Sequence, residues 1–385
     1  MKIKYPLAKE TINNEDIDAL CNWLKTYPRL TKGNLTVELE KQWAELIGTK
    51  YSVFCNSGSS ANLLMIAAAA MARNNKKIIV PSVGWVTTIA PAIQLGLNPI
   101  MVDADPNTFG IDLDKLEKVC QKENPGIVIF VQVLGVPHYK ERLLSLKEKY
   151  GFLLLEDGCA ALGARYADGT KVGTVGDMST FSFYFGHQLS TIEGGMVNTS
   201  NLELQRNLMM LRSHGWGKDL DEEHYKHLMS KHEVDDFHQP FTFFIPGFNL
   251  RSTDLQAFIG IRQIEKADWC FDNRNKNHLG YADRLRGYVE YQNWGDDYPV
   301  SISFGALAES STHRKEIVSN LVENGVETRI FSAGNLGRHP FWTNLYGIFE
   351  AAVSDKIHER GFFLPNCPEM KEEEVDFICD VVKGV

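Results

Sequence analysis

His187 is the residue whose type and setting most strongly indicate chemistry. It follows an aromatic-rich run from Phe181 to Phe185 and precedes Glu193 and the pair Gly194-Gly195. Imidazole titrates near pH ~6.5, so it can accept and return a proton at neutral pH. A glycine pair permits backbone angles that other residues avoid. A lone histidine is more often structural than catalytic, so its neighbours must decide its role.

A loop of small residues, Asn56 to Asn62, could bind a phosphate. It lies between a short apolar segment and a predicted helix. The backbone amides of Gly58 and Ser59 would then face an anion at the helix N-terminus, assisted by the helix dipole. An ordinary helix cap by Ser59 or Ser60 explains the same residues. The loop alone leaves both interpretations open.

Two further side chains follow strand-like runs. Asp157 ends the run Leu153 to Asp157, where a carboxylate could keep a heterocyclic ring nitrogen protonated. A helix cap or a metal ligand are the alternatives for this carboxylate. Trp85 follows Lys77 to Pro81 and could stack on a planar ring, although a tryptophan in this position is more often packed in the core.

Weaker candidates lie further along the chain. The Pro-Gly pair at 246–247 fixes a turn that would project Asn249 and Arg251, and His214 lies at a predicted helix end. Surface turn chemistry explains these residues equally well. Arg329 ends a predicted strand, and its guanidinium could hold a carboxylate through two parallel hydrogen bonds.

The hydrophobic pattern predicts a scaffold that could bring these residues together. Strand-like runs at 77–81, 99–103, 126–134, 152–157, 179–185 and 196–199 alternate with helical segments at 59–73, 113–122 and 141–150. Such alternation predicts a mostly parallel, doubly wound α/β sheet. Ligands bind such sheets at the carboxyl ends of the strands, where most of the candidate residues are placed.

The second half of the chain changes character. Residues 218–238 are charged and rich in histidine, which predicts an exposed excursion. A long helix from about residue 250 is expected to lead into a smaller unit. That unit is predicted to contain strands at 300–304 and 326–331 and helices at 311–324 and 371–382. We therefore expect a large domain over 1–250, including the N-terminal segment, and a small C-terminal domain over 251–385.

Composition excludes several classes of protein. The 385 residues carry a net charge of −9 without a long basic run, which argues against nucleic acid as a partner. No run of about 18 uncharged apolar residues predicts a membrane span, and the N-terminus lacks the apolar core of a signal peptide. Seven scattered cysteines lack the spacing of a zinc or iron–sulfur site. Free thiols, no metal and a cytoplasmic location are the expectation.

The order and spacing of the motifs resemble the DegT/DnrJ/EryC1/StrS family of sugar enzymes over nearly the whole chain. The shared stretches are Ser57 to Ile66, Trp85 to Thr88, Leu155 to Asp157, His214 to Trp216 and Pro246 to Asn249. The resemblance implies the aspartate aminotransferase fold, fold type I of the pyridoxal phosphate (PLP) enzymes. That fold has a mostly parallel seven-stranded sheet in a PLP-binding domain and a smaller C-terminal α+β domain.

The resemblance also implies roles for the residues at the strand ends. Gly58, Ser59 and Ser182 would hold the cofactor phosphate. Trp85 would stack on the cofactor ring, and Asp157 would pair with the ring nitrogen. The pyridine ring then acts as an electron sink.

The remaining candidates would bind substrates or the second subunit of a homodimer. Asn249 would reach the phosphate in the neighbouring subunit, so that the active sites are shared. Arg329 would bind the α-carboxylate of glutamate. His214 and Arg251 would lie near the nucleotide sugar.

His187 indicates the type of reaction. Members of the family usually have a lysine at this position, which binds the cofactor covalently. Histidine cannot form a stable link of this kind. The resemblance then implies a PLP- or pyridoxamine phosphate (PMP)-dependent dehydratase that uses glutamate as the amino donor. It would remove the C3 hydroxyl of a nucleotide-linked 4-keto-6-deoxy sugar, with GDP-4-keto-6-deoxymannose favoured, in deoxysugar biosynthesis for O-antigen lipopolysaccharide. His187 would move the protons of this elimination.

Two alternatives remain beside the dehydratase. The first is a nucleotide-sugar aminotransferase that tolerates histidine, and the second is a non-catalytic relative that binds a cofactor or sugar nucleotide for regulation. Two departures from the family pattern bear on the substrate. Ala160 stands where the family often has glutamine or glutamate, and Gly186 stands where serine is common.

Overall fold

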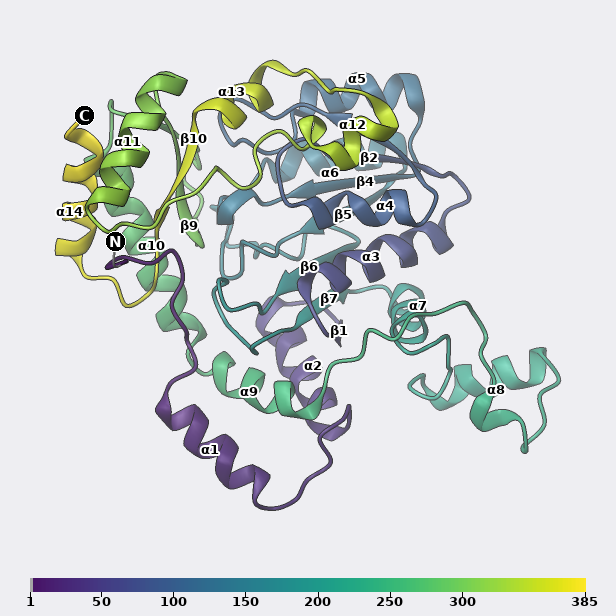
Figure 1. Ribbon diagram of the computed structural model, residues 1–385. Helices are drawn as coiled ribbons and strands as arrows, with labels where there is room; N and C mark the ends of the chain where they lie inside the picture. The colour runs from purple at the N-terminus through teal and green to yellow at the C-terminus, as the bar shows by residue number, and fades with distance from the viewer. Residues whose placement is uncertain (1–2) are drawn as a thin grey trace.

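A seven-stranded sheet forms the centre of the protein in the computed structural model, which describes residues 3–385 (Figure 1). Its strands are β1 (Tyr51–Cys55), β2 (Lys77–Pro81), β3 (Asn98–Val102), β4 (Ile127–Val131), β5 (Leu153–Asp157), β6 (Met178–Ser182) and β7 (Gly195–Thr199). They lie in the order β1-β7-β6-β5-β4-β2-β3. Only β7 runs antiparallel to its neighbours β1 and β6. The predicted mostly parallel, seven-stranded sheet is confirmed.

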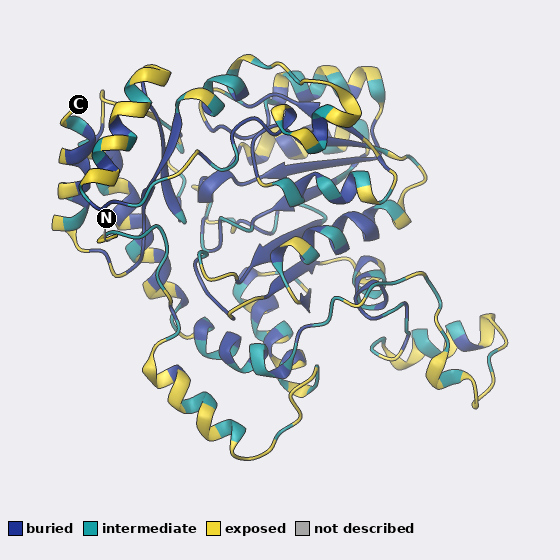
Figure 2. Cartoon of the chain, in the orientation of Figure 1, coloured by how far each residue is buried: buried dark blue, intermediate teal, exposed yellow. Residues whose placement is uncertain are grey.

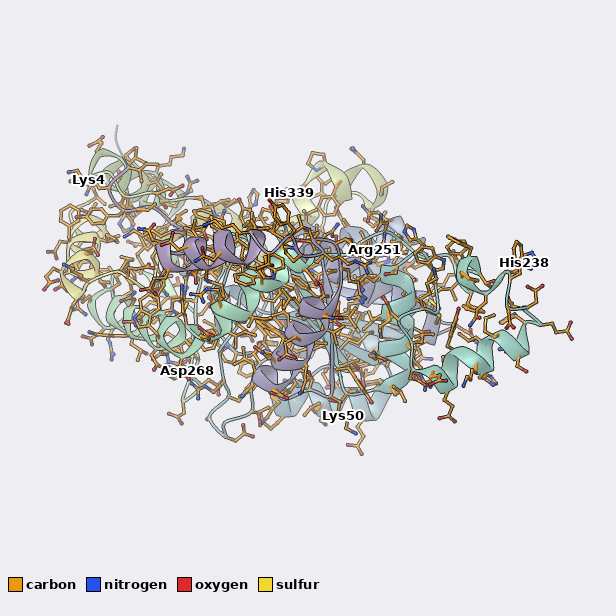
Figure 3. The ribbon with its side chains drawn as sticks, turned by 90° about the horizontal axis from the view of Figure 1, so that it is seen from below. Lys4, Lys50, His238, Arg251, Asp268 and His339 are labelled. Atoms are coloured by element: carbon orange, nitrogen blue, oxygen red, sulfur yellow. The ribbon has the colours of Figure 1, made fainter. Side chains whose placement is uncertain are left out.

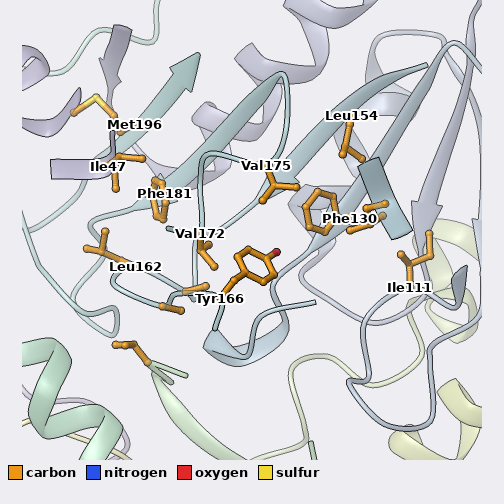
Figure 4. Packing of buried hydrophobic residues seen from close by; sticks show 14 of the residues in the cluster. Ile47, Ile111, Phe130, Leu154, Leu162, Tyr166, Val172, Val175, Phe181 and Met196 are labelled. Atoms are coloured by element: carbon orange, nitrogen blue, oxygen red, sulfur yellow. The ribbon is translucent and has the colours of Figure 1, made fainter. Parts of the chain in front are cut away.

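Helices cover both faces of this sheet. On one face pack α2 (Asn34–Ile47), α5 (Leu113–Glu123), α6 (Lys140–Tyr150) and α9 (Asp254–Ile264), and on the other α3 (Gly58–Ala72), α4 (Ala90–Gln94) and α7 (Leu202–Arg212). Alternate residues of β4 therefore enter different cores. Val128 and Phe130 belong to the first, part of which Figure 4 shows, and Ile127 and Ile129 to the second. Burial on both faces explains why β4 is apolar without alternation.

Several predicted boundaries were too long at the strand ends. The run 126–134 stops being a strand at Val131, because the chain turns at 133–135 with Leu134 in the left-handed region at φ 56°. The run 179–185 likewise ends as a strand at Ser182. Both strands stop where a cavity begins, so the apolar pattern continues past the sheet into turns that line it.

A second, antiparallel sheet of three strands lies in the C-terminal part. Its order is β10 (Gly361–Pro365), β9 (Ser303–Leu307) and β8 (Glu290–Tyr291). The helices α10 (Ala267–Arg284), α11 (Ser311–Glu323) and α14 (Glu372–Lys383) pack on it around a separate hydrophobic cluster. The predicted α+β character is confirmed, while the division of the chain at residue 250 stays a prediction.

Three predictions in this region were wrong, and one strand was missed. The segment 326–331 is no strand, because its pairing is split between Tyr5, which contacts Val326, and Phe362, which contacts Ile330. The strand missed by the sequence pattern is the fully buried β10. The predicted long helix from residue 250 is two helices, α9 and α10, which break where Lys266 pairs with the buried Asp16. The predicted strand at 300–304 begins only at Ser303.

Peripheral helices complete the structure. They are α1 (Asn14–Leu24), α8 (Glu222–Lys231), α12 (Pro340–Tyr346) and α13 (Ala352–Arg360). The segment around α8 projects from the body, as the excursion predicted at 218–238 requires, and Figure 2 shows how much of it is exposed. Within the part of the chain that the structure describes, no helix is long and apolar enough to cross a membrane.

Candidate active site

A cavity of about 560 Å³ opens at the carboxyl ends of the central strands. Seven of the ten predicted site residues line it, namely Gly58, Ser59, Trp85, Asp157, Ser182, His187 and Arg329. The N-terminal segment at Leu7 and the small sheet at Ser303 and Phe363 close other sides. The cavity therefore lies where the strand-end rule predicts it, between the central sheet and the C-terminal unit.

Asp157 is held in one orientation by three donors at the end of β5. It is 3% exposed. Its Oδ2 accepts hydrogen bonds from Asn62 Nδ2 at 2.9 Å and from Thr88 Oγ1 at 2.6 Å. Its Oδ1 accepts one from the backbone amide of Cys159 at 3.1 Å. A carboxylate that is fixed in this way at the cavity wall fits the pairing with a protonated ring nitrogen.

The sequence patterns gave no role to Asn62 and Thr88, the two side chains that donate to Asp157. Both stand at the ends of motifs that it had singled out, Asn56 to Asn62 and the stretch after Trp85. Thr180 donates to Asn62 Oδ1 at 2.7 Å, which fixes the amide so that its NH₂ group faces Asp157. The available signal was a single polar residue, Asn62, in the otherwise apolar run from Ala61 to Ala72 of α3.

The start of α3 forms a cradle for an anion. Ser57 is the cap, since its Oγ accepts from the backbone amide of Ser60 at 3.1 Å, so the predicted cap at Ser59 or Ser60 was wrong. The amides of Gly58 and Ser59 in the first turn have no partner within the helix. A Cβ on Gly58 would lie 2.5 Å from the Cβ of Ser182, so only glycine allows this approach. The donors fit a phosphate.

Trp85 lines the cavity with an exposed ring. Its side chain follows β2 and is 53% exposed. The packed-core interpretation of this tryptophan is therefore wrong. An exposed tryptophan in the wall of the cavity that Asp157 also lines fits stacking on a planar ring.

His187 lies on the turn that follows β6. Its backbone amide donates to the carbonyl of Tyr184 at 2.9 Å, and its ring Nδ1 is buried without a hydrogen-bond partner in residues 3–385. Burial lowers the pKa of His187 to about 4, helped by the charges of Arg274 and Arg329 and opposed by the backbone of Cys159. The imidazole is therefore neutral at pH 7 and able to accept a proton. No lysine lines the cavity among the described residues.

Arg329 presents a guanidinium without an acidic partner among residues 3–385. Its Cζ lies 5.0 Å from the ring centroid of Phe363. Burial lowers its pKa, and the carboxylate of Glu327 opposes the shift. Glu327 itself accepts from the backbone amide of Leu7 at 2.8 Å. An arginine that is free of ion pairs at the wall can bind an incoming carboxylate.

The family model for the DegT/DnrJ/EryC1/StrS aminotransferase family matches residues 10–383. The chain belongs to this family. It is 33% identical to GDP-4-keto-6-deoxy-D-mannose 3-dehydratase from Yersinia pseudotuberculosis, a match that spans 99% of this chain and 98% of that protein. The aminotransferase family was thus identified correctly from its motifs.

Solved structures of relatives extend the comparison to three dimensions. A histidine-to-asparagine variant of GDP-4-keto-6-deoxymannose-3-dehydratase (ColD) with bound GDP-perosamine matches with a TM-score of 0.90 and 29% identity, over 98% of this chain and 100% of that one. The same enzyme with a trapped PLP-glutamate geminal diamine matches with a TM-score of 0.89 and 29% identity, over 98% and 100%. The predicted aminotransferase fold is confirmed.

Three predicted site residues lie outside the cavity of their own chain. Asn249 is exposed, and its backbone bridges to Ser213. Arg251 bridges to Cys55, and its guanidinium lies 5.9 Å from the ring centroid of Trp216. His214 adopts a left-handed conformation at φ 62° and donates its amide to Phe248 O. In Figure 3, Arg251 lies on the body and His238 at the tip of the projection.

The segments His214 to Trp216 and Pro246 to Asn249 pack together because each contains a glycine at the point of contact. A Cβ on Gly215 would lie 1.8 Å from Ile245 O, and one on Gly247 would lie 2.2 Å from Gly215 N. The His-Gly-Trp and Pro-Gly-Phe-Asn segments therefore cross in close contact. Their glycines serve this crossing, which leaves Asn249 exposed and His214 half-buried.

Ala160 adds no polar side chain to the cavity, as the sequence predicted. Its carbonyl accepts from Gln188 Nε2 at 2.8 Å, which joins the loop after β5 to the turn after β6. Other polar side chains line the wall, and the sequence reasoning assigned them no role: Tyr184, Glu193, Glu327 and Ser332. These residues supply polar groups where residue 160 does not.

Proposed function

We propose that this protein is a PLP/PMP-dependent dehydratase that removes the C3 hydroxyl of GDP-4-keto-6-deoxymannose, with L-glutamate as amino donor. The observation that carries the proposal is the place of His187 in a cavity whose described lining holds no lysine. The names of the relatives support the substrate. The reaction belongs to the biosynthesis of a 3,6-dideoxysugar of the colitose type for O-antigen lipopolysaccharide.

The cavity residues fit the cofactor. Asp157 binds the protonated ring nitrogen, Trp85 stacks on the ring, and Gly58, Ser59 and Ser182 bind the phosphate. When bound in its amine form, the cofactor supplies an electron sink that makes the sugar C3 hydroxyl a leaving group. The structure with a PLP-glutamate adduct of a relative supports both the cofactor and the amino donor.

His187 moves the protons of the reaction. Its neutral imidazole accepts the proton released at the cofactor C4′ carbon, and the resulting imidazolium donates that proton to the departing C3 hydroxyl, which leaves as water. A lysine at this position would favour completion of amino transfer instead, because it can form a covalent link to the cofactor. Arg329 binds the α-carboxylate of glutamate.

The site is completed by a second copy of the chain in a homodimer. Asn249 of one subunit reaches the cofactor phosphate of the other, and His214 and Arg251 contact the nucleotide sugar there. Their position outside their own cavity supports this arrangement. A cytoplasmic location is part of the proposal and is supported by the seven free thiols.

Product analysis tests the proposed function. The purified protein is incubated with PLP, glutamate and GDP-4-keto-6-deoxymannose, and the products are followed by mass spectrometry and an ammonia assay. We expect ammonia, 2-oxoglutarate and a GDP-linked 4-keto-3,6-dideoxy sugar in equal amounts. A stable GDP-amino sugar would instead show an aminotransferase, and binding without turnover would show a non-catalytic relative.

A further inference from the structure

Arg274, on α10, is a buried cation with only neutral partners. Its side chain is 1% exposed and forms no salt bridge within residues 3–385. Its Nη2 donates to the backbone carbonyl of His187 at 3.2 Å. Its Nη1 donates to the carbonyls of Ile302, at 3.1 Å, and Asn366. A charge without a counter-ion is costly to bury, so this arginine needs an explanation beyond stability.

The partners of Arg274 lie on three segments that meet at the cavity. Ile302 directly precedes β9, Asn366 directly follows β10, and His187 lies on the turn after β6. One guanidinium therefore joins the small sheet to the turn that carries the acid–base residue. Its fork of donors suits this task, because several N–H groups leave one rigid plane.

A second residue on the same face of α10 also contacts the turn that carries His187. Cys270 precedes Arg274 by one helical turn, and its Sγ donates to the carbonyl of Gln188 at 3.0 Å. The helix thus holds two consecutive carbonyls, those of His187 and Gln188. Gln188 in turn donates to the carbonyl of Val300 at 2.9 Å. The turn is thus held by α10 and by the segment before β9, in addition to the hydrogen bond from Gln188 to Ala160 on the loop after β5.

We propose that Arg274 is a positioning residue, which fixes the peptide of His187 against the small sheet and sets the place of its imidazole in the cavity. The inference rests on the proposed function for the role of His187. It assigns to α10 an indirect share in the proton transfer, through the backbone of His187.

The charge of Arg274 has a second effect at the same place. After burial, Arg274 is the larger of two cationic influences that lower the pKa of His187, and Arg329 is the other. The remaining titratable groups that line the same cavity are Asp157, Cys159, Tyr184, Glu193 and Glu327. Removal of the Arg274 charge should therefore raise the pKa of His187 toward its ordinary value.

Titration of the His187 ring by NMR tests the proposal without any turnover. The protein, prepared with and without PLP, is labelled with ¹³C at the histidine rings, and the His187 signal among the 11 histidines is assigned from its absence in His187→Asn. In wild type, His187 should stay neutral from pH 8 to pH 5. In Arg274→Gln, its midpoint should rise by about one unit or more. In Arg274→Lys, which keeps the charge, the midpoint of the His187 titration should stay within a few tenths of a pH unit of the wild-type value.

The control and the contrary results separate this inference from the proposed function. Arg165→Gln removes another arginine, which stacks on Tyr298 at 4.9 Å, and should leave the His187 titration unchanged. An unmoved titration in Arg274→Gln overturns the inference, whether or not the protein is a dehydratase. If that variant does not fold, Arg274→Lys decides. Lysine keeps the charge but lacks the fork of donors, so the chemical shift of the His187 ring in Arg274→Lys at pH 8 reports on position. A shift identical to wild type would contradict the positioning role, and a displaced signal would support it.

Discussion

The predicted residues at the strand ends meet in one cavity, whereas those predicted between 214 and 251 lie outside it. Asp157 and Ser182 are buried, and Asp157 is fixed by hydrogen bonds within its own chain. Asn249 is exposed, and the segment that precedes it projects from the body. The first group is placed by the fold of one chain. The second group gains a function only if a second copy brings it to the cavity.

The largest expected effect concerns the first region. Asp157→Ala removes the anion that would pair with the ring nitrogen and leaves Asn62 and Thr88 without their acceptor. Loss of a charge-assisted hydrogen bond costs about 2 kcal/mol or more, so PLP affinity should fall by ~30-fold or more. Absorbance titration with PLP measures this. Thr88→Val, which removes one donor to the same carboxylate, should weaken binding less. Equal affinity of Asp157→Ala and wild type would exclude this carboxylate from the cofactor site.

Complementation between subunits tests the second region directly. His187→Asn and the double variant Asn249→Ala/Arg251→Ala should each be nearly inactive as homodimers. A mixed dimer of the two contains one cavity with all defects and one with none, so it should recover about half the wild-type activity per dimer. Co-expression with two affinity tags isolates that species. Activity no higher than the mean of the two parents would mean that the sites are not shared.

Arg329 separates the two substrates. Arg329→Gln should raise KM for glutamate by ~10-fold to ~100-fold, because it removes a bidentate contact to the carboxylate, and should change the sugar KM little. Steady-state kinetics with each substrate varied in turn measures both values. Arg338→Gln, in the exposed ion pair with Asp355, is the matched control. An equal rise in both KM values would remove Arg329 from the glutamate site.

The smallest effect is on stability at acid pH, to which two buried histidines outside the cavity contribute besides His187. Burial lowers the pKa of His138 to about 4 and of His278 to about 3. Both are neutral when folded, while the unfolded chain protonates them near pH ~6.5. Stability should therefore be complete above pH ~6.5 and decrease as the pH falls toward these folded values. The melting temperature should follow this course, and the melting temperature of His278→Asn should fall less steeply as the pH is lowered. If the melting temperature of His278→Asn depends on pH as steeply as that of wild type, His278 does not contribute to the acid destabilisation.

The sequence predicted the strand-end residues because two independent patterns agreed. Each residue follows an apolar run, and parallel strands bring their carboxyl ends to one edge. No second pattern of this kind was available for the predicted strand at 326–331. Its partners, Tyr5 and Phe362, are remote in sequence, and each pairs with a single residue of the segment. β10 was missed because five buried residues without alternation resemble any short apolar segment.

Residues that act through others were beyond the sequence patterns. Asn62 and Thr88 orient Asp157 across distances of 95 and 69 residues in the chain. Arg274 lies in a helix whose pattern shows only an ordinary basic residue. Its burial and its contact with the His187 carbonyl depend on how α10 packs against two sheets. Such roles follow from tertiary structure alone.

Reduction with borohydride tests the central claim, that residue 187 works as a free acid–base group rather than as a covalent anchor. The PLP-loaded protein is reduced, digested and mapped by mass spectrometry, with His187→Lys treated in parallel. The wild-type protein should carry no cofactor on any lysine, while the variant should carry it on residue 187. A cofactor bound to a lysine of the wild-type chain would contradict the account.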